Sequence, residues 1–359
     1  MIDLDKLTCK CGYFKLINKD HCCFSCSVNN NHGPNCLKIN NLKTYIDTNY
    51  CCLTNFHDIN SHGPLCELFN QTEIIPVIVC IAKGEENYIE EFVLYHLSIG
   101  FNHIFIYDNE DKPKYYNLLH KYKDNITVIH FPCLDYENKQ MAALMDFQKN
   151  YINNMNITHV IHMDIDEYIV LKENNNIKEF IKKYIFSQGN NNNNCAGIAI
   201  NWKFFGSNIN SDFKINAEKY NLTANNNIMR FTNCEKSGHR LVKTLFNKSC
   251  LRFFYNPHII AVKKNFFIKN TSNKNYDNFD VTFNHKTFDT NFIDTDIIQI
   301  NHYKCKTFDE YKKIRTRGHA CGSKYDYNNI SAEFSSYDRN KDEDFTAYNY
   351  YLKNIVNNQ

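Results

Sequence analysis

The sequence predicts an α/β protein built on a doubly wound, mostly parallel sheet and preceded by a small module rich in cysteine and histidine. Two observations predict this organisation: apolar runs alternate with segments of helical periodicity from residue 74 onward, and nine of the 16 cysteines fall within the first 66 residues. The length of 359 residues also exceeds that of a typical single domain. We therefore expect a Cys/His-rich module over 1–70, a large domain over 71–330 and a C-terminal extension over 331–359.

The first 70 residues carry two approximate copies of one pattern, in which a Cys-Cys pair precedes a His-Gly-Pro-x-Cys segment. Such spacing in a chain without an export signal favours structural zinc over disulfides. Zinc contributes an apparent ~10–16 kcal/mol to the folding of small modules. A disulfide-stapled module is the alternative. Candidate zinc ligands are Cys23, Cys26, His32, Cys36, Cys52, His57, His62 and Cys66, with Cys9 or Cys11 able to replace one of them.

The large domain begins with a strand over 74–82, where a nearly continuous apolar run is typical of burial on both faces. A helix over 89–97 follows, because apolar residues recur at helical spacing and Gly100 stands just past the end. Further strands are predicted over 103–107, 126–131 and 158–163, and further helices over 115–122, 140–151 and 307–317. This order predicts parallel strands. The Asn-rich stretch over 189–194 is predicted as a loop.

Acidic residues stand at the ends of two predicted strands. Asp108 follows one of them, and Asp164, Asp166 and Glu167 follow the strand over 158–163. Ligands of open parallel sheets gather at the carboxyl ends of strands, and carboxylates there suit Mg²⁺ or Mn²⁺. A cation held in this way stabilises a departing nucleoside diphosphate. An isolated Asp-x-Asp motif is a weak indication of a metal site. The prediction of a metal site therefore depends on the position of this motif directly after an apolar strand.

Several further segments carry a resemblance to a known family. They are 81–92, 95–96, 100–101, 104–109, 162–169, 202–207, Lys243, 301–303 and 317–318. In this order they resemble glycosyltransferase family 92 and related family 2-like glycosyltransferases of the A-type fold. The resemblance covers roughly residues 75 to 320. Several motifs in one order are more specific than any single motif.

The resemblance implies a metal-dependent transfer of a hexose from a UDP-sugar to a glycan, protein or lipid acceptor. It implies Mn²⁺ or Mg²⁺ as cofactor, bound by Asp164, Asp166 and His302. Trp202 and Gly206 would shape the acceptor pocket. Residues that would contact the nucleotide sugar are Ala82, Lys83, Glu85, Asp108, Gln140, Asp164 and Ile165.

The chain departs from the family pattern at two points. Gly84 replaces the asparagine that usually follows Ala-Lys, and no motif fixes the catalytic base. The family's usual course is inversion by direct displacement, in which a carboxylate removes the proton of the acceptor hydroxyl. Glu235 is our candidate for that base, with an exposed loop carboxylate as the alternative.

Four site residues have plain structural alternatives. Trp202 could belong to the core, Asp108 could close an Asx-turn at the end of its strand, and His302 could pack beside Tyr303. Glu167 is expected to orient its neighbours rather than to bind metal.

Charge and hydropathy exclude other classes of function. The formal net charge is +2, so nothing indicates a nucleic-acid or membrane-surface partner. No apolar run of about 18 residues and no signal-peptide core is present, so we expect a soluble, cytoplasmic protein. The residue bias indicates an AT-rich genome, such as that of a giant virus or a protist. Two other functions stay open: a degenerate transferase fold that serves as a binding module, and a nucleotidyltransferase.

Overall fold

The computed structural model describes the backbone of two short strands, β1 (Lys15–Leu16) and β2 (Lys19–Cys22), and residues 73–132, 137–153, 155–173, 176–186, 194–264, 266–272, 293–316 and 329–358. The chain divides into two compact units, Met1–Glu73 with Gln188–Asn193 and Ile74–Ser187 with Asn194–Gln359. In the first unit, β1 and β2 pair antiparallel. All candidate zinc ligands lie outside the described residues, so the zinc-binding module stays a prediction.

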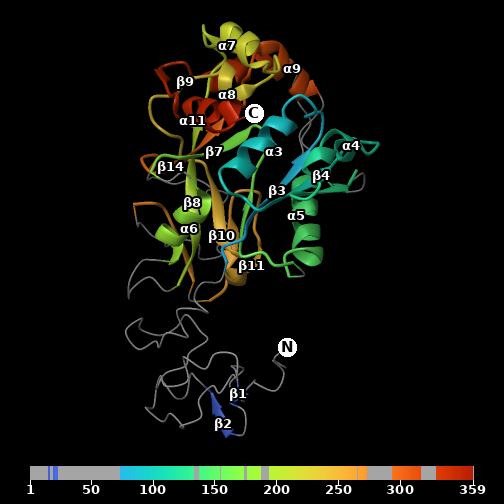
Figure 1. Ribbon diagram of the computed structural model, residues 1–359, viewed down its shortest axis with the longest axis vertical. Coiled ribbons are helices and arrows are strands. Elements are labelled where there is room, and N and C mark those ends of the chain that lie inside the picture. Colours follow the sequence, from blue (N-terminus) through green and yellow to red (C-terminus); the bar gives the residue numbers. More distant parts are fainter. Residues whose placement is uncertain are drawn as a thin grey trace. The chain divides into compact units, whose positions relative to one another are not determined.

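A nine-stranded sheet forms the centre of the second unit (Figure 1). Its strands, in spatial order, are β5 (Ile126–His130), β4 (His103–Asp108), β3 (Pro76–Ala82), β6 (His159–His162), β10 (Val242–Asn247), β8 (Cys195–Phe204), β14 (Ile298–His302) and β7 (Glu167–Leu171), and β13 (Phe267–Lys269) pairs with β8. The strands from β5 to β6 are parallel, as predicted.

The sheet as a whole is mixed, which corrects the prediction of a mostly parallel, doubly wound sheet. β10 runs antiparallel to both β6 and β8, and β7 runs antiparallel to β14. The error has a physical cause. β8 and β10 are buried along almost their whole length, so their residues show no regular alternation of polar and apolar positions, and their sequences carry no sign of strand direction.

Strand direction brings several strand ends to one edge of the sheet. Because β10 is antiparallel to both β6 and β8, those two strands run the same way, and β14 is parallel to β8. The strands β3, β4, β6, β8 and β14 therefore all finish at one edge, which we call the carboxyl edge. Their last residues are Ala82, Asp108, His162, Phe204 and His302.

The sheet is covered on both faces. Alternate residues of β3 point to opposite sides, with Ile78 and Cys80 in one apolar cluster and Val77 and Val79 in the other. The first cluster contains side chains from α3 (Ile89–Ser98), α6 (Ile177–Ile181), α8 (Asn227–Arg230) and α11 (Thr346–Asn354). The second contains side chains from α5 (Lys139–Asn150) and the hairpin of β11 (Leu251–Phe254) and β12 (Ile260–Val262).

The predicted helices form where their sequence signals stand. The side chain of Asn138 caps α5 by accepting a 3.0 Å hydrogen bond from the Met141 amide. Gly100, just past α3, has φ +102°, which a residue with a side chain rarely adopts. The predicted helix over 115–122 is split into α4 (Tyr115–Leu118) and a 3-10 turn over His120–Tyr122, and α9 (Phe308–Thr316) confirms the late helix.

The C-terminal residues set apart in the sequence analysis contain α10 (Ile330–Tyr337) and α11. Ala347, Tyr348 and Tyr351 of α11 belong to the first apolar cluster. Just before α11, Asp344 accepts hydrogen bonds from Lys203 at 3.1 Å and Gln299 at 2.9 Å, on β8 and β14. Figure 1 shows α7, α8, α9 and α11 gathered at one end of this unit.

The remaining described elements are short. They are α7 (Phe213–Tyr220), β9 (Asn233–Cys234) paired with β15 (Asp342–Glu343), a π-helical turn over Lys182–Phe186, and 3-10 turns over Lys248–Cys250 and Val356–Asn358. None of the helices in the described part of the chain is long and apolar enough to cross a bilayer.

Candidate active site

The turn between β6 and β7 places the predicted carboxylates at the carboxyl edge. The Glu167 amide donates to the Asp164 carbonyl at 3.0 Å, and the Asp164 amide donates to the Glu167 carboxylate at 2.9 Å, so the turn is closed twice. Ile165 is only 3% exposed and belongs to the first apolar cluster. Its burial anchors the turn, and Asp164 and Asp166 lie on either side of that anchor.

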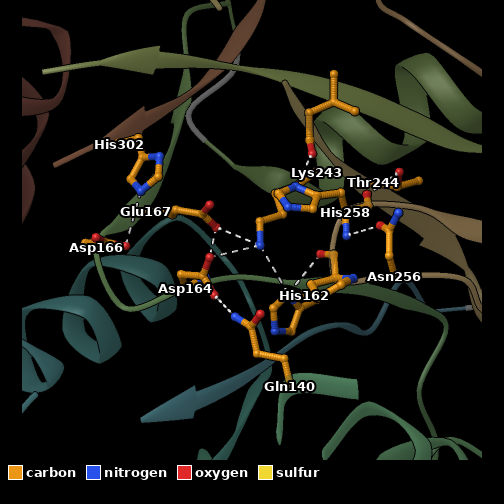
Figure 2. A network of polar contacts seen from close by, with 12 residues as sticks. Gln140, His162, Asp164, Asp166, Glu167, Lys243, Thr244, Asn256, His258 and His302 are labelled. Carbon is orange, nitrogen blue, oxygen red and sulfur yellow. Dashed lines mark hydrogen bonds and ion pairs between the residues drawn. The ribbon is translucent and has the colours of Figure 1, made fainter. Parts of the chain in front are cut away.

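Lys243, at the start of β10, meets this turn from the neighbouring strand (Figure 2). Its ammonium nitrogen lies 3.2 Å from Oδ2 of Asp164 and 3.5 Å from Oε2 of Glu167, and its side chain is fully buried. The other oxygen of Asp164 accepts a 2.8 Å hydrogen bond from Gln140. The predicted residues Gln140 and Asp164 are therefore in direct contact.

The charges of this group follow from burial and proximity. Burial is the largest influence on the pKa of Asp164 and raises it, but the lowering influences, with the positive charge of Lys243 the largest of them, together outweigh burial and the pKa is lowered. Burial likewise opposes the charge of Lys243, but Asp164 and Glu167 raise its pKa. Complete burial raises the pKa of Glu167 well above its usual range. Lys243 and Asp164 therefore favour each other's charged forms, whereas burial disfavours the charged form of Glu167.

Two histidines complete the surroundings of Lys243. Burial, followed by the charge of Lys243, lowers the pKa of both His162 and His258 to about 3, so both are neutral at pH 7. Nδ1 of His162 lies 3.0 Å from the Pro257 carbonyl oxygen, which only accepts hydrogen bonds. That nitrogen therefore carries the hydrogen, and its 3.2 Å approach to Lys243 is a close contact rather than a hydrogen bond.

Asp166 faces His302 rather than Lys243 (Figure 2). Oδ1 of Asp166 lies 3.5 Å from Nε2 of His302, and the imidazole packs against the rings of Trp202 at 4.4 Å and Phe204 at 5.1 Å. Burial lowers the pKa of His302 although Asp166 raises it, so the ring is neutral at pH 7. Burial raises the pKa of Asp166, but His302 and two nearby lysines bring it well below its usual range.

The Asp166–His302 pair has the chemistry of a divalent-cation site. A carboxylate oxygen and a neutral imidazole nitrogen are donors that Mn²⁺ accepts, and two ligands of one such ion lie roughly 3 Å apart. Across the described residues, no group of three or more His, Cys, Asp or Glu side chains is arranged around a common point. Asp164, the third predicted ligand, is turned to Lys243 and Gln140 instead. A cation here would be held by two side chains and by ligand oxygens.

The residues predicted to contact the nucleotide follow β3 and β4 at the same edge. Asp108 is completely buried, and its carboxylate accepts backbone hydrogen bonds from Glu110 at 3.1 Å, Lys114 at 2.7 Å and Tyr115 at 3.1 Å. The Asp108 carboxylate therefore holds the backbone of the loop after β4, as the Asx-turn alternative predicts.

The loop after β3 holds the other residues predicted to contact the nucleotide. Ala82 is completely buried, and Glu85 is 6% exposed, with its carbonyl oxygen accepting the first amides of the helical turn. Lys83 forms a 3.2 Å ion pair with Asp111 on the surface. Gly84 has φ +63°, a conformation that asparagine also tolerates, which explains the departure from the family pattern.

The residues predicted for the acceptor side surround the end of β8. Glu235 accepts a 2.8 Å hydrogen bond from the Phe204 amide, and Phe204 is paired with His302 in the sheet, so Glu235 lies at the carboxyl edge. Burial raises the pKa of Glu235 to about 7. Trp202 is 6% exposed and belongs to the core cluster. Gly206 packs so closely on Asn340 that an added Cβ would collide with it.

Sequence reasoning assigned no role to Lys243 or to Lys306. For Lys243 the available signal was its place among the motifs of the family resemblance, and a buried ammonium is rarely unpaired. Lys306 carried no such signal, since it lies in a short connection next to other polar residues.

Comparison with known proteins adds one finding. A family model described as glycosyltransferase family 92 matches residues 75–347 of this chain. The match covers all the strands of the central sheet, the carboxyl edge and most of the C-terminal region, but none of the Cys/His-rich segment. No curated protein matches the chain.

Proposed function

Because the chain belongs to glycosyltransferase family 92 and is therefore a glycosyltransferase, we propose that it transfers a hexose from a UDP-sugar to a glycan, protein or lipid acceptor, with inversion and with Mn²⁺ or Mg²⁺. The observation that carries this proposal is the Asp166–His302 pair at 3.5 Å on the carboxyl edge. It lies where open α/β sheets bind their ligands.

Asp166 and His302 would hold the cation, which would neutralise the charge that develops on the leaving diphosphate. Asp164 has a different part in this proposal. Lys243 keeps it ionised, and Gln140 fixes the orientation of its carboxylate. It therefore supports the turn that presents Asp166 and offers its partly exposed edge to the donor.

Glu235 is the proposed base. Its carboxylate would take the proton of the acceptor hydroxyl while that oxygen forms a bond to the anomeric carbon. The bond from the anomeric carbon to the diphosphate oxygen breaks in the same step, and UDP leaves with the electron pair. A carboxylate with a pKa of about 7 suits this task, because near neutral pH it is partly ionised and strongly basic for its type.

The test is release of UDP from a panel of UDP-hexoses, measured on the full chain with Mn²⁺ and with EDTA. We expect turnover only with the metal. Asp166→Asn should lower kcat by roughly 10²–10³, because a preorganised electrostatic contact is lost. Asp146→Asn is the matched control, since Asp146 also has a partly buried carboxylate, but it lies on α5 and accepts a hydrogen bond from Tyr107 of β4.

Three results would contradict the proposal. One is UDP release that EDTA leaves unchanged, and a second is an Asp166→Asn enzyme as active as Asp146→Asn. The third is a product whose anomeric configuration, assigned by NMR, matches that of the donor, which would exclude inversion.

A further inference from the structure

We propose that the ammonium group of Lys306 binds the diphosphate of the nucleotide-sugar donor, an inference that rests on the function proposed above. Lys306 lies in the connection between β14 and α9, four residues after His302. It is 1% exposed. The carboxyl edge thus carries another buried lysine, and its surroundings differ from those of Lys243.

The buried ammonium of Lys306 lacks a hydrogen-bond acceptor. Within the part of the chain that the structure describes, no atom accepts a hydrogen bond from its nitrogen. The nitrogen lies 4.4 Å from the centre of the Tyr88 ring, whose face attracts a cation. Three donor hydrogens have lost their water, and the ring replaces only part of that solvation. By contrast, Lys243 has carboxylate partners.

The nearby carboxylate of Glu310 already accepts hydrogen bonds from other residues through both oxygens. Glu310 accepts from Arg230 through both oxygens, at 2.8 and 2.6 Å, and from the Tyr88 hydroxyl at 2.6 Å. It also accepts from the amide and hydroxyl of Thr307, the residue that follows Lys306. Glu310 therefore holds the Tyr88 ring in place but has no lone pair left for Lys306. A hydrogen-bond acceptor for Lys306 therefore has to come from elsewhere.

The backbone at Lys306 is also unusual. Its φ is +51°, in the left-handed region that lysine rarely adopts. Such conformations persist where the surrounding structure enforces them, and they gather at binding and catalytic sites. A glycine would adopt this φ without strain but would provide no charge. The sequence thus has a lysine at a position that suits glycine.

The position of the loop indicates the ligand. The Tyr303 amide donates to the Asp166 carbonyl at 2.8 Å, which ties the segment before Lys306 to the Asp166 turn. The charge of Lys306, like that of Lys304, lowers the pKa of Asp166, so the ammonium acts on this turn. A donor diphosphate at Asp166 and His302 therefore lies within reach of this charge. Lysine commonly binds phosphate as a point charge.

The experiment measures binding of UDP, UMP, uridine and inorganic pyrophosphate to the full chain by calorimetry, with Mn²⁺ present. We expect Lys306→Gln to weaken UDP and pyrophosphate by about tenfold or more, the size of a lost charged hydrogen bond, and to leave uridine unchanged. Lys306→Gly should weaken UDP equally while its melting temperature equals or exceeds that of the wild type, because the backbone strain is relieved. Lys219→Gln is the control, since that ammonium also lies over a tyrosine ring, 4.7 Å from the centre of Tyr220 on α7.

Each outcome separates this inference from the proposed function. If UDP binds but Lys306→Gln binds it as well as the wild type does, or Lys219→Gln loses as much, the Lys306 inference is wrong and the proposed function stands. If the wild type binds pyrophosphate through Lys306 but not UDP, the anion site stands and the UDP donor is wrong. If the wild type binds neither, both proposals fail.

Discussion

The two aspartate side chains at the carboxyl edge have different partners, although the Asp-x-Asp spacing alone predicts that both bind one cation. Asp164 and Asp166 are two positions apart, yet the first is paired with a buried ammonium and the second with an imidazole. Removing only one partner of a buried ion pair typically destabilises a protein by roughly 3–5 kcal/mol. Lys243 therefore stabilises the fold as well as the site. Replacing it is expected to lower the free energy of unfolding in addition to any effect on activity.

Glu235 gives a prediction at the same scale. Its pKa of about 7 means that the carboxylate form, which is needed by a base, increases as the pH rises through 7. We expect log kcat/KM to rise from pH 5.5 and to level off above about 7.5. Glu235→Gln should remove this rising limb and lower kcat by roughly 10²–10⁴. A steady-state pH profile in the presence of saturating Mn²⁺ measures both effects.

A Glu235→Gln enzyme that keeps the wild-type rising limb would show that another group titrates. Glu343→Gln serves as the control, because Glu343 is exposed on β15 and has no place in the proposed chemistry.

At the scale of elements, Glu310 joins α9 to α8. Its carboxylate is paired with Arg230 of α8, and although burial opposes ionisation, these hydrogen bonds lower its pKa from 4.5 to about 2. A depressed carboxyl pKa stabilises the fold above the unfolded value near 4.5, and this stability is lost as the pH falls toward 2. A shift of this size corresponds to roughly 3 kcal/mol at most.

We therefore expect the urea midpoint of the wild type to fall steeply between pH 4.5 and 2.5. Glu310→Gln should be less stable at pH 7 by about 2–3 kcal/mol and should show a flatter acid limb. Unfolding curves at four pH values measure this. Equal acid limbs in the two proteins would mean that the ionisation of Glu310 contributes nothing to the loss of stability in acid.

Elements also show where prediction from sequence succeeds. The strands and helices up to Asp164 are confirmed almost residue by residue, because each apolar run is followed by polar, Gly or Asn signals that end it. β7, β8, β10 and β14 were not predicted. Their order in the sheet depends on pairings between distant segments. In a strand as deeply buried as β8, the sequence shows neither an alternation of polar and apolar residues nor the direction in which the strand runs.

The same contrast holds for the site. The sequence predicts that Asp164, Asp166, His302 and Gln140 lie near one another, and strand ends and pairings bring them to one edge. It could not predict that Lys243 would occupy the space beside Asp164, because that contact depends on the reversed direction of β10.

At the scale of the whole molecule, the Cys/His-rich segment gives a separate prediction. If each of its two copies binds zinc, elemental analysis of purified full chain should find about two zinc ions per chain. Cys36→Ser and Cys66→Ser should each remove one, whereas Cys250→Ser, at a buried free thiol of the second unit, should remove none. Metal-free protein whose cysteines are paired would favour the disulfide alternative.

The strand order also determines when activity can arise during folding. Asp166 is made early in the chain, whereas His302 arrives only after β8, β10 and their long connections have been synthesised and have paired with the strands already present. Contacts between such distant segments close slowly, because large loops must be ordered first. The ability to turn over substrate should therefore be among the last properties a newly made chain gains, and chains interrupted before β14 would be folded in part but inert.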